Sequence, residues 1–222
     1  MNSFFNGLIL VICFITLPFA LAVGLNEDFT FFGMNIPGEE FAYKDWFFIL
    51  IAAVVFLLGA TKASRKWSAL AVVKQKSRFL FAANISAKRK NSIVLFGGLE
   101  WLFILLVGTF FLIITRETWV IALVLFIMLF EHILHLSYGL ISNKFGVGMT
   151  SKAIVAADRS YVVIYFHGLK KVIKQQNNLL FDYGNNLVLE LDLDRMEPEQ
   201  QALFIIELKK IANPKRVFYD GV

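Results

Sequence analysis

The sequence has few of the features that soluble enzymes use for chemistry. Cys13 is the only cysteine, which excludes an internal disulfide and a thiolate metal site. Charged residues make up 18% of the chain, below the roughly 25% that is usual in a soluble domain. No phosphate-binding glycine loop, nucleophile elbow or kinase-type signature is present. These absences favour a protein that is not an enzyme.

Four long apolar stretches are present instead. Hydrophobic residues make up 58% of the chain, and the mean hydropathy is +0.65. A membrane-spanning helix needs roughly 20 mainly apolar residues. We therefore predict a transmembrane domain over residues 1–142, with helices over about 4–24, 46–64, 93–115 and 119–141. A cleavable signal peptide ending at Ala20-Leu21-Ala22 is the alternative for the first helix.

The charges between these stretches predict the orientation in the membrane. The segment 25–45 holds five acidic residues against Lys44 alone, whereas the loop 61–92 holds nine basic residues and no acidic one. Because loops rich in Lys and Arg stay in the cytoplasm, we expect this loop and both termini to be cytoplasmic.

Attraction to anionic lipid headgroups explains the basic loop without a nucleic-acid partner. Apolar residues between the basic ones favour an amphipathic segment that lies in the membrane interface. The predicted headgroup contacts are Lys62, Arg65, Lys66, Lys74, Lys76, Arg78, Lys88, Arg89 and Lys90.

After a predicted linker over 143–147, the pattern changes to that of β-strands. Short segments rich in apolar and β-branched residues are found at 152–156, 161–166, 170–175, 179–183 and 187–193. Gly184-Asn185-Asn186 predicts a hairpin turn. A helix with Pro198 in its first turn follows, and Asn213-Pro214 ends it. We expect a second domain over 147–222, an α+β fold of antiparallel strands closed by a C-terminal helix.

Two segments of this domain carry a family resemblance, together with the hairpin strands and the final helix. They are Met149-Thr150-Ser151-Lys152-Ala153-Ile154-Val155 and Tyr165-Phe166-His167-Gly168-Leu169-Lys170-Lys171-Val172. The pattern resembles the membrane-anchored bacterial pleckstrin-homology-like proteins of the YcxB-like group. The resemblance implies a pleckstrin-homology-like cytoplasmic domain behind transmembrane helices in a bacterial inner membrane. It implies no catalytic residues.

Ionisable residues lie inside the predicted membrane helices, where they are costly and point to function. They are Glu100 in the third helix and Glu131, His132 and His135 in the fourth. A short turn near Glu117 would place Glu100 level with these three residues. Gly97-Gly98 would let the two helices approach closely.

Three interpretations of this cluster follow from its chemistry. Glu100 could pair with His132 or His135 and hold the helical hairpin together. The four groups could instead relay protons or ions, or they could bind a divalent metal, as in a membrane metalloenzyme.

The leading hypothesis is a non-enzymatic inner-membrane scaffold or accessory subunit without a cofactor, whose cytoplasmic pleckstrin-homology-like module binds a partner protein or the membrane surface. Its expected partners are membrane lipids and either another membrane protein or a second copy of the chain. The alternative is a small proton- or ion-coupled transport subunit that uses the Glu/His cluster.

Overall fold

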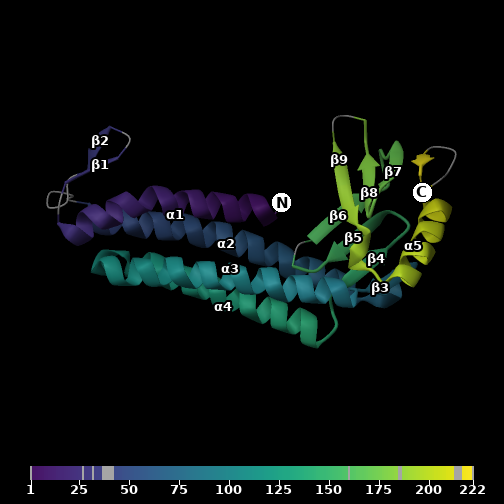
Figure 1. Cartoon of the computed structure of the whole chain (residues 1–222), viewed down its shortest axis with the longest axis horizontal. Helices are drawn as coiled ribbons and strands as arrows, with labels where there is room; N and C mark the ends of the chain where they lie inside the picture. Colours follow the sequence, from purple (N-terminus) through teal and green to yellow (C-terminus); the bar gives the residue numbers. More distant parts are fainter. Residues whose placement is uncertain are drawn as a thin grey trace. The chain divides into compact units, whose positions relative to one another are not determined.

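The computed structural model describes residues 2–26, 28–31, 33–36, 43–159, 161–184, 187–212 and 217–221. The chain forms two compact units, one of residues 1–64 and 98–135 and the other of residues 65–97 and 136–222. Within these described residues, four helices are long and apolar enough to cross a membrane, in agreement with the predicted number (Figure 1). They are α1 (Asn2–Leu25), α2 (Lys44–Lys74), α3 (Ala87–Ile114) and α4 (Trp119–Ile141).

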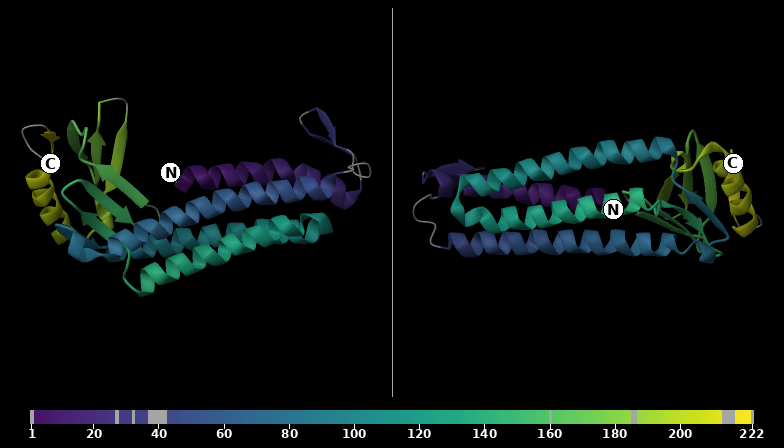
Figure 2. Two further views of the ribbon diagram at one scale, coloured as in Figure 1. Left: turned by 180° about the vertical axis from the view of Figure 1, so that it is seen from behind. Right: turned by 90° about the horizontal axis from the view of Figure 1, so that it is seen from below.

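The first unit is a bundle made from these four helices, which run side by side (Figure 2). Its core contains Cys13 of α1, Phe48 and Val55 of α2, Phe111 of α3, and Ile121 of α4. At the end of α1, a Cβ atom added to Gly24 would lie 2.4 Å from the carbonyl oxygen of Ile114. The α1 and α3 backbones therefore approach so closely that only glycine fits there.

Two connections join the helices at one end of this bundle. The 3-10 turn η2 (Arg116–Thr118) joins α3 to α4, as the sequence predicts. The Lys44 ammonium lies 3.1 Å from the Glu117 carboxylate, which links the start of α2 to this turn. Strands β1 (Phe29–Phe31) and β2 (Met34–Ile36) form a small hairpin between α1 and α2. Glu27, Glu39 and Glu40 of the predicted acidic segment lie outside the described residues.

The segment 61–92 differs from the predicted interfacial loop. Helix α2 continues to Lys74 rather than ending near residue 64, and α3 begins at Ala87 rather than near residue 93. Between them lie the 3-10 turn η1 (Lys76–Arg78) and strand β3 (Phe81–Asn84). Residues 81–84 form a strand because they pair with residues 146–149, which follow both α3 and α4 in the chain. A pairing between such distant segments leaves no local signal in the sequence.

The second unit contains a sheet in the order β3-β4-β5-β6, with every neighbouring pair antiparallel. Its other strands are β4 (Gly146–Met149), β5 (Ala153–Ala157) and β6 (Tyr161–Tyr165). Residues 146 and 147 fall in the predicted linker, yet all four residues of β4 are buried. Strand β4 is buried because it lies inside the sheet and pairs with a strand on each side, β3 and β5.

A second sheet in the same unit has the order β10-β7-β8-β9. It consists of β7 (Lys171–Gln175), β8 (Asn178–Asp182), β9 (Val188–Asp192) and β10 (Phe218–Asp220). The predicted hairpin is confirmed, because β8 and β9 pair antiparallel, whereas β10 adds a strand parallel to β7. Asn185-Asn186 of the predicted turn and the predicted helix stop Asn213-Pro214 lie outside the described residues.

Helix α5 (Pro198–Ile211) closes a core that both sheets share. Met149 and Ile164 come from one sheet, Phe181 from the other, and Phe204 and Leu208 from α5. All five are essentially inaccessible to solvent. The predicted antiparallel strands closed by a C-terminal helix are therefore present in the second unit.

The ends of three long helices also belong to the second unit, because it includes residues 65–74, 87–97 and 136–141. On α2, Ala69 and Val73 pack against Val155 and Ala157 of β5. The Trp67 ring of α2 lies 5.9 Å from that of Tyr138 on α4. The sheets and these helix ends thus form one packed body.

The start of α3 is bonded to the segment that leads into α5. The backbone N–H of Ser86 donates to the carbonyl oxygen of Arg195 at 2.9 Å. The N–H of Ala87 donates to the Glu197 carboxylate at 2.8 Å, and the Ser86 hydroxyl donates to the Asp194 carbonyl. These bonds engage the amide groups that a helix N-terminus otherwise leaves unpaired.

A buried charge network strengthens the same junction. Nε and Nη2 of Arg89 on α3 lie 2.8 and 2.7 Å from Oδ2 of Asp158, whose side chain is 1% exposed. Nη1 of Arg195 lies 3.4 Å from the same Asp158 oxygen. Oδ2 of Asp192 lies 3.2 Å from Nη1 of Arg89. Burial lowers the pKa of the Arg195 guanidinium, and the Asp158 carboxylate opposes this shift. Each carboxylate thus contacts at least one guanidinium at this junction.

Candidate functional site

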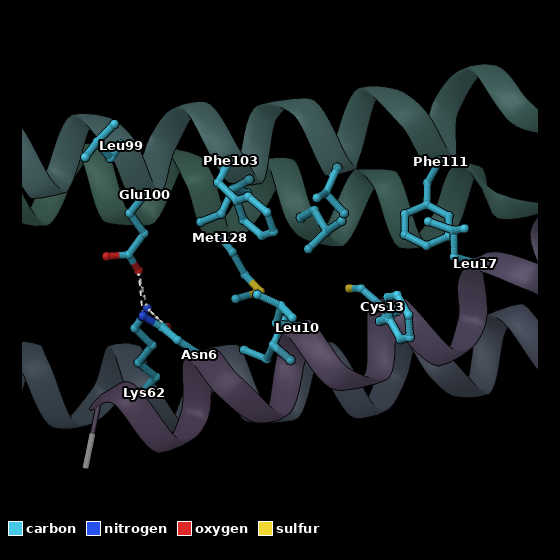
Figure 3. Close-up of a pocket in the computed structure, with 15 residues that line it drawn as sticks. Asn6, Leu10, Cys13, Leu17, Lys62, Leu99, Glu100, Phe103, Phe111 and Met128 are labelled. Carbon is cyan, nitrogen blue, oxygen red and sulfur yellow. Dashed lines mark hydrogen bonds and ion pairs between the residues drawn. The ribbon is translucent and has the colours of Figure 1, made fainter.

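The first unit contains a buried polar cluster on three helices. Lys62 of α2 is 6% exposed, and its ammonium donates to Oε1 of Glu100 on α3 at 2.8 Å. The Asn6 side chain of α1 donates to the same oxygen at 3.1 Å and accepts a hydrogen bond from Lys62 (Figure 3). One carboxylate, one ammonium and one amide are therefore hydrogen-bonded to one another within an apolar bundle.

The fourth helix contributes a histidine to this cluster. Nε2 of His132 lies 3.6 Å from Oε2 of Glu100, and the His132 side chain is buried. The Trp101 ring stands edge-on to the imidazole at 6.5 Å between centroids. Glu100 and His132 are therefore neighbours, as the hairpin interpretation of the sequence expects, but 3.6 Å is longer than a hydrogen bond.

The remaining two residues of the predicted cluster lie on the same helix. His135 is buried and Glu131 is half-buried. Among the described residues, no three His, Cys, Asp or Glu side chains come together closely enough to hold a metal ion. The arrangement therefore offers no support for the metal-binding interpretation.

Sequence reasoning missed two hydrogen-bond partners of Glu100, Lys62 and Asn6. Lys62 was expected at the lipid headgroups, whereas in the structure its ammonium is buried and paired with Glu100. The assumption of a helix ending near residue 64 placed Lys62 at the interface, whereas α2 continues for another three turns. Asn6 carries no charge, so a search for ionisable residues could not find it.

The other predicted headgroup residues have varied surroundings. Lys66 is buried and Arg89 belongs to the Asp158 network, whereas Lys90 donates to Asn143 at 2.8 Å. Lys88 is exposed and pairs with Asp194. Headgroup contact stays a prediction for the exposed basic residues, which include Arg65, Lys74, Lys76 and Arg78.

A pocket of about 560 Å³ extends from the polar cluster between α1 and α3 (Figure 3). Along α1 it is lined by Asn6, Leu10, Cys13 and Leu17, which recur at helical spacing on one face. Glu100, Phe103, Val107 and Phe111 line it in the same way along α3. The pocket is polar only at the end where Asn6, Lys62 and Glu100 meet.

Comparison with family models, curated proteins and solved structures found no match to this chain. The chemistry of the site therefore has to be inferred from its own geometry. The cluster contains an ion pair and an amide at one end of an apolar pocket. Such a site is suited to holding helices together and to binding a molecule by its shape and one polar group.

Proposed function

We propose that this protein is a non-enzymatic, multi-pass scaffold or accessory subunit of a bacterial inner membrane, and that its second unit binds a partner protein. The observation that carries the proposal is the construction of the second unit. Strand β5 of its first sheet packs on the C-terminal end of α2, and the first strand of that sheet precedes α3 while the second follows α4. The module is thus joined to these helix ends by packing as well as by the chain itself.

The basic residues support a cytoplasmic position for the second unit and for both termini. Arg65, Lys74, Lys76 and Arg78 are exposed around the end of α2. Lys and Arg near the ends of membrane spans are retained on the cytoplasmic side, where anionic lipids also attract them. The turn with Glu117 and the start of α2 then lie outside.

The architecture of the second unit supports a pleckstrin-homology-like module. Strands β3 to β6 form one antiparallel sheet and β7 to β9 the main part of a second, and α5 closes the core between them. This is the strand-then-helix order that the family resemblance implies. The α3–α4 hairpin is inserted between the first two strands, and β10 is an addition.

The contacts of Glu100 favour a structural role for the membrane cluster over proton-coupled transport. Lys62 and Asn6 both donate to its carboxylate, and His132 faces the second oxygen. These contacts tie Glu100 of α3 to α1, α2 and α4, and a buried ion pair of this kind needs both of its partners in place. We therefore assign the cluster to stabilisation of the bundle.

Affinity purification of the full chain from native membranes in mild detergent tests the partner. We expect a membrane protein to co-purify in a fixed ratio. Leu203 and Ile206 on α5 are 56% and 50% exposed, and they lie one turn apart. If the partner binds α5, the double variant Leu203→Glu, Ile206→Glu should no longer co-purify it. The matched control is Val188→Glu, which alters a similarly exposed apolar residue on β9 and should keep the partner.

Two other results of this purification would change the proposal. Purified protein that binds no partner, but moves ions or turns over a substrate when it is alone in liposomes, would remove the scaffold proposal. Co-purification of a second copy in place of another protein would identify the partner as the chain itself.

A further inference from the structure

The pocket between α1 and α3 has the shape of a trough with one polar end. Ile9, Cys13 and Phe111 at its base are buried. Leu10, Phe14 and Phe103 at its edges are exposed, so the trough opens on the side of the helical bundle. In a membrane, this side would face lipid chains and not water.

The dimensions of the trough match one lipid tail. It extends along α1 from Asn6 to Leu17, which corresponds to about 16 Å at the rise of an α-helix. This length is close to half of the roughly 30 Å hydrocarbon core of a bilayer. The volume of about 560 Å³ lies within the range of small-molecule sites. A single alkyl chain from one leaflet therefore fits along it.

The polar end determines the type of headgroup. Lys62 and Glu100 neutralise each other at 2.8 Å, so an added anion or cation would face a like charge within the pair. The Lys62 ammonium has three protons, of which Asn6 and Glu100 receive two. The Asn6 amide has two, of which Glu100 receives one. A ligand oxygen can accept the remaining protons.

We propose that this trough is a binding site for an uncharged, single-chain lipid whose headgroup bears a hydroxyl, such as a long-chain alcohol or a monoacylglycerol. Its oxygen accepts from Lys62 or Asn6, and its O–H donates to Glu100. The alkyl chain lies along Leu10, Cys13 and Leu17 and is covered from α3 by Phe103. The site is independent of any partner that the second unit binds.

The test uses full-length protein in phosphatidylcholine liposomes with a photoreactive hexadecanol that carries a diazirine in its chain. We expect ultraviolet light to attach the probe to peptides of α1 or α3. Unlabelled hexadecanol should compete with the probe, and hexadecane and hexadecanoic acid should compete far less. Equal competition by hexadecane would show that any chain fills the trough, and stronger competition by the acid would show an anion site. Either result would overturn the proposal.

Two helix variants separate occupation of the trough from general contact with lipid. Leu10→Trp fills the trough and should abolish labelling, whereas Ile15→Trp should not change it. The two residues are 47% and 49% exposed on the same helix, and only Leu10 lines the trough. Asn6→Ala, which removes one donor, should weaken competition by hexadecanol about three- to tenfold. Unchanged labelling of folded, monodisperse Leu10→Trp protein would contradict the proposed site.

Discussion

Replacement of Glu100 by glutamine is expected to destabilise the first unit by about 3–5 kcal/mol, because it leaves the Lys62 ammonium buried without a countercharge. Lys62 and Glu100 have side chains that are only 7% and 17% exposed. The free energy of unfolding can be compared by denaturant titration of the purified protein in detergent micelles. The variant should also yield less folded protein from the membrane fraction.

A double variant distinguishes loss of the ion pair from general disruption. In Lys62→Met, Glu100→Leu no charge is left behind, so most of the lost stability should return. Glu117→Gln is the matched control, since its pair with Lys44 is more exposed, with side chains 24% and 38% accessible. It should cost less than about 1 kcal/mol. If Glu100→Gln is as stable as the unaltered protein, the ion pair is not structural and the transport hypothesis gains support.

Asp158→Ala should destabilise the second unit by about 3–5 kcal/mol. The carboxylate is almost inaccessible and contacts Arg89 and Arg195, so its removal leaves two guanidinium groups close together. Nearby Asp192 contacts Arg89 at 3.2 Å and compensates for only part of this charge. Limited proteolysis of the purified protein should show earlier cleavage among the strands, together with a lower melting temperature.

An exposed ion pair in the same unit provides the comparison for this prediction. Asp220 lies 3.0 Å from Lys171, with a side chain that is 56% accessible. Asp220→Ala should therefore change the free energy of unfolding by less than about 1 kcal/mol. Equal effects of the two substitutions would mean that burial of Asp158 does not govern the stability of this junction.

The long helices and the hairpin strands could be predicted because their signals are local. Long apolar runs indicate membrane helices without any knowledge of tertiary contacts. Alternating residues on both sides of Gly184 indicate a hairpin in the same way. In both cases the residues that determine the element lie within it or directly beside it.

Strands β3 and β4 could not be predicted because their partners are remote or their residues are small. Phe81 pairs with Met149 across the whole α3–α4 hairpin, so nothing near residue 81 indicates a strand. Gly146 and Gly148 give β4 a composition typical of a linker. Their burial in the centre of the sheet depends on tertiary contacts.

The polar cluster was predicted only in part for a related reason. Helical spacing and the short turn correctly place Glu100 beside His132. The ion-pair partner Lys62 comes from α2, and sequence spacing gives no measure of how α2 packs against α3. A lysine near the end of an apolar run is as compatible with snorkelling as with a buried ion pair.

The orientation of the chain in the membrane tests the central claim most directly, and the single natural cysteine makes the measurement simple. In a Cys13→Ala background, Tyr43→Cys, Arg116→Cys, Ser77→Cys and Lys152→Cys each place one thiol at an exposed position. Sealed right-side-out cells are treated with a membrane-impermeant maleimide, before and after permeabilisation. The account predicts that positions 43 and 116 react from outside, and that positions 77 and 152 react only after permeabilisation. Reaction of positions 77 and 152 from outside would contradict a cytoplasmic second unit and, with it, the proposed scaffold.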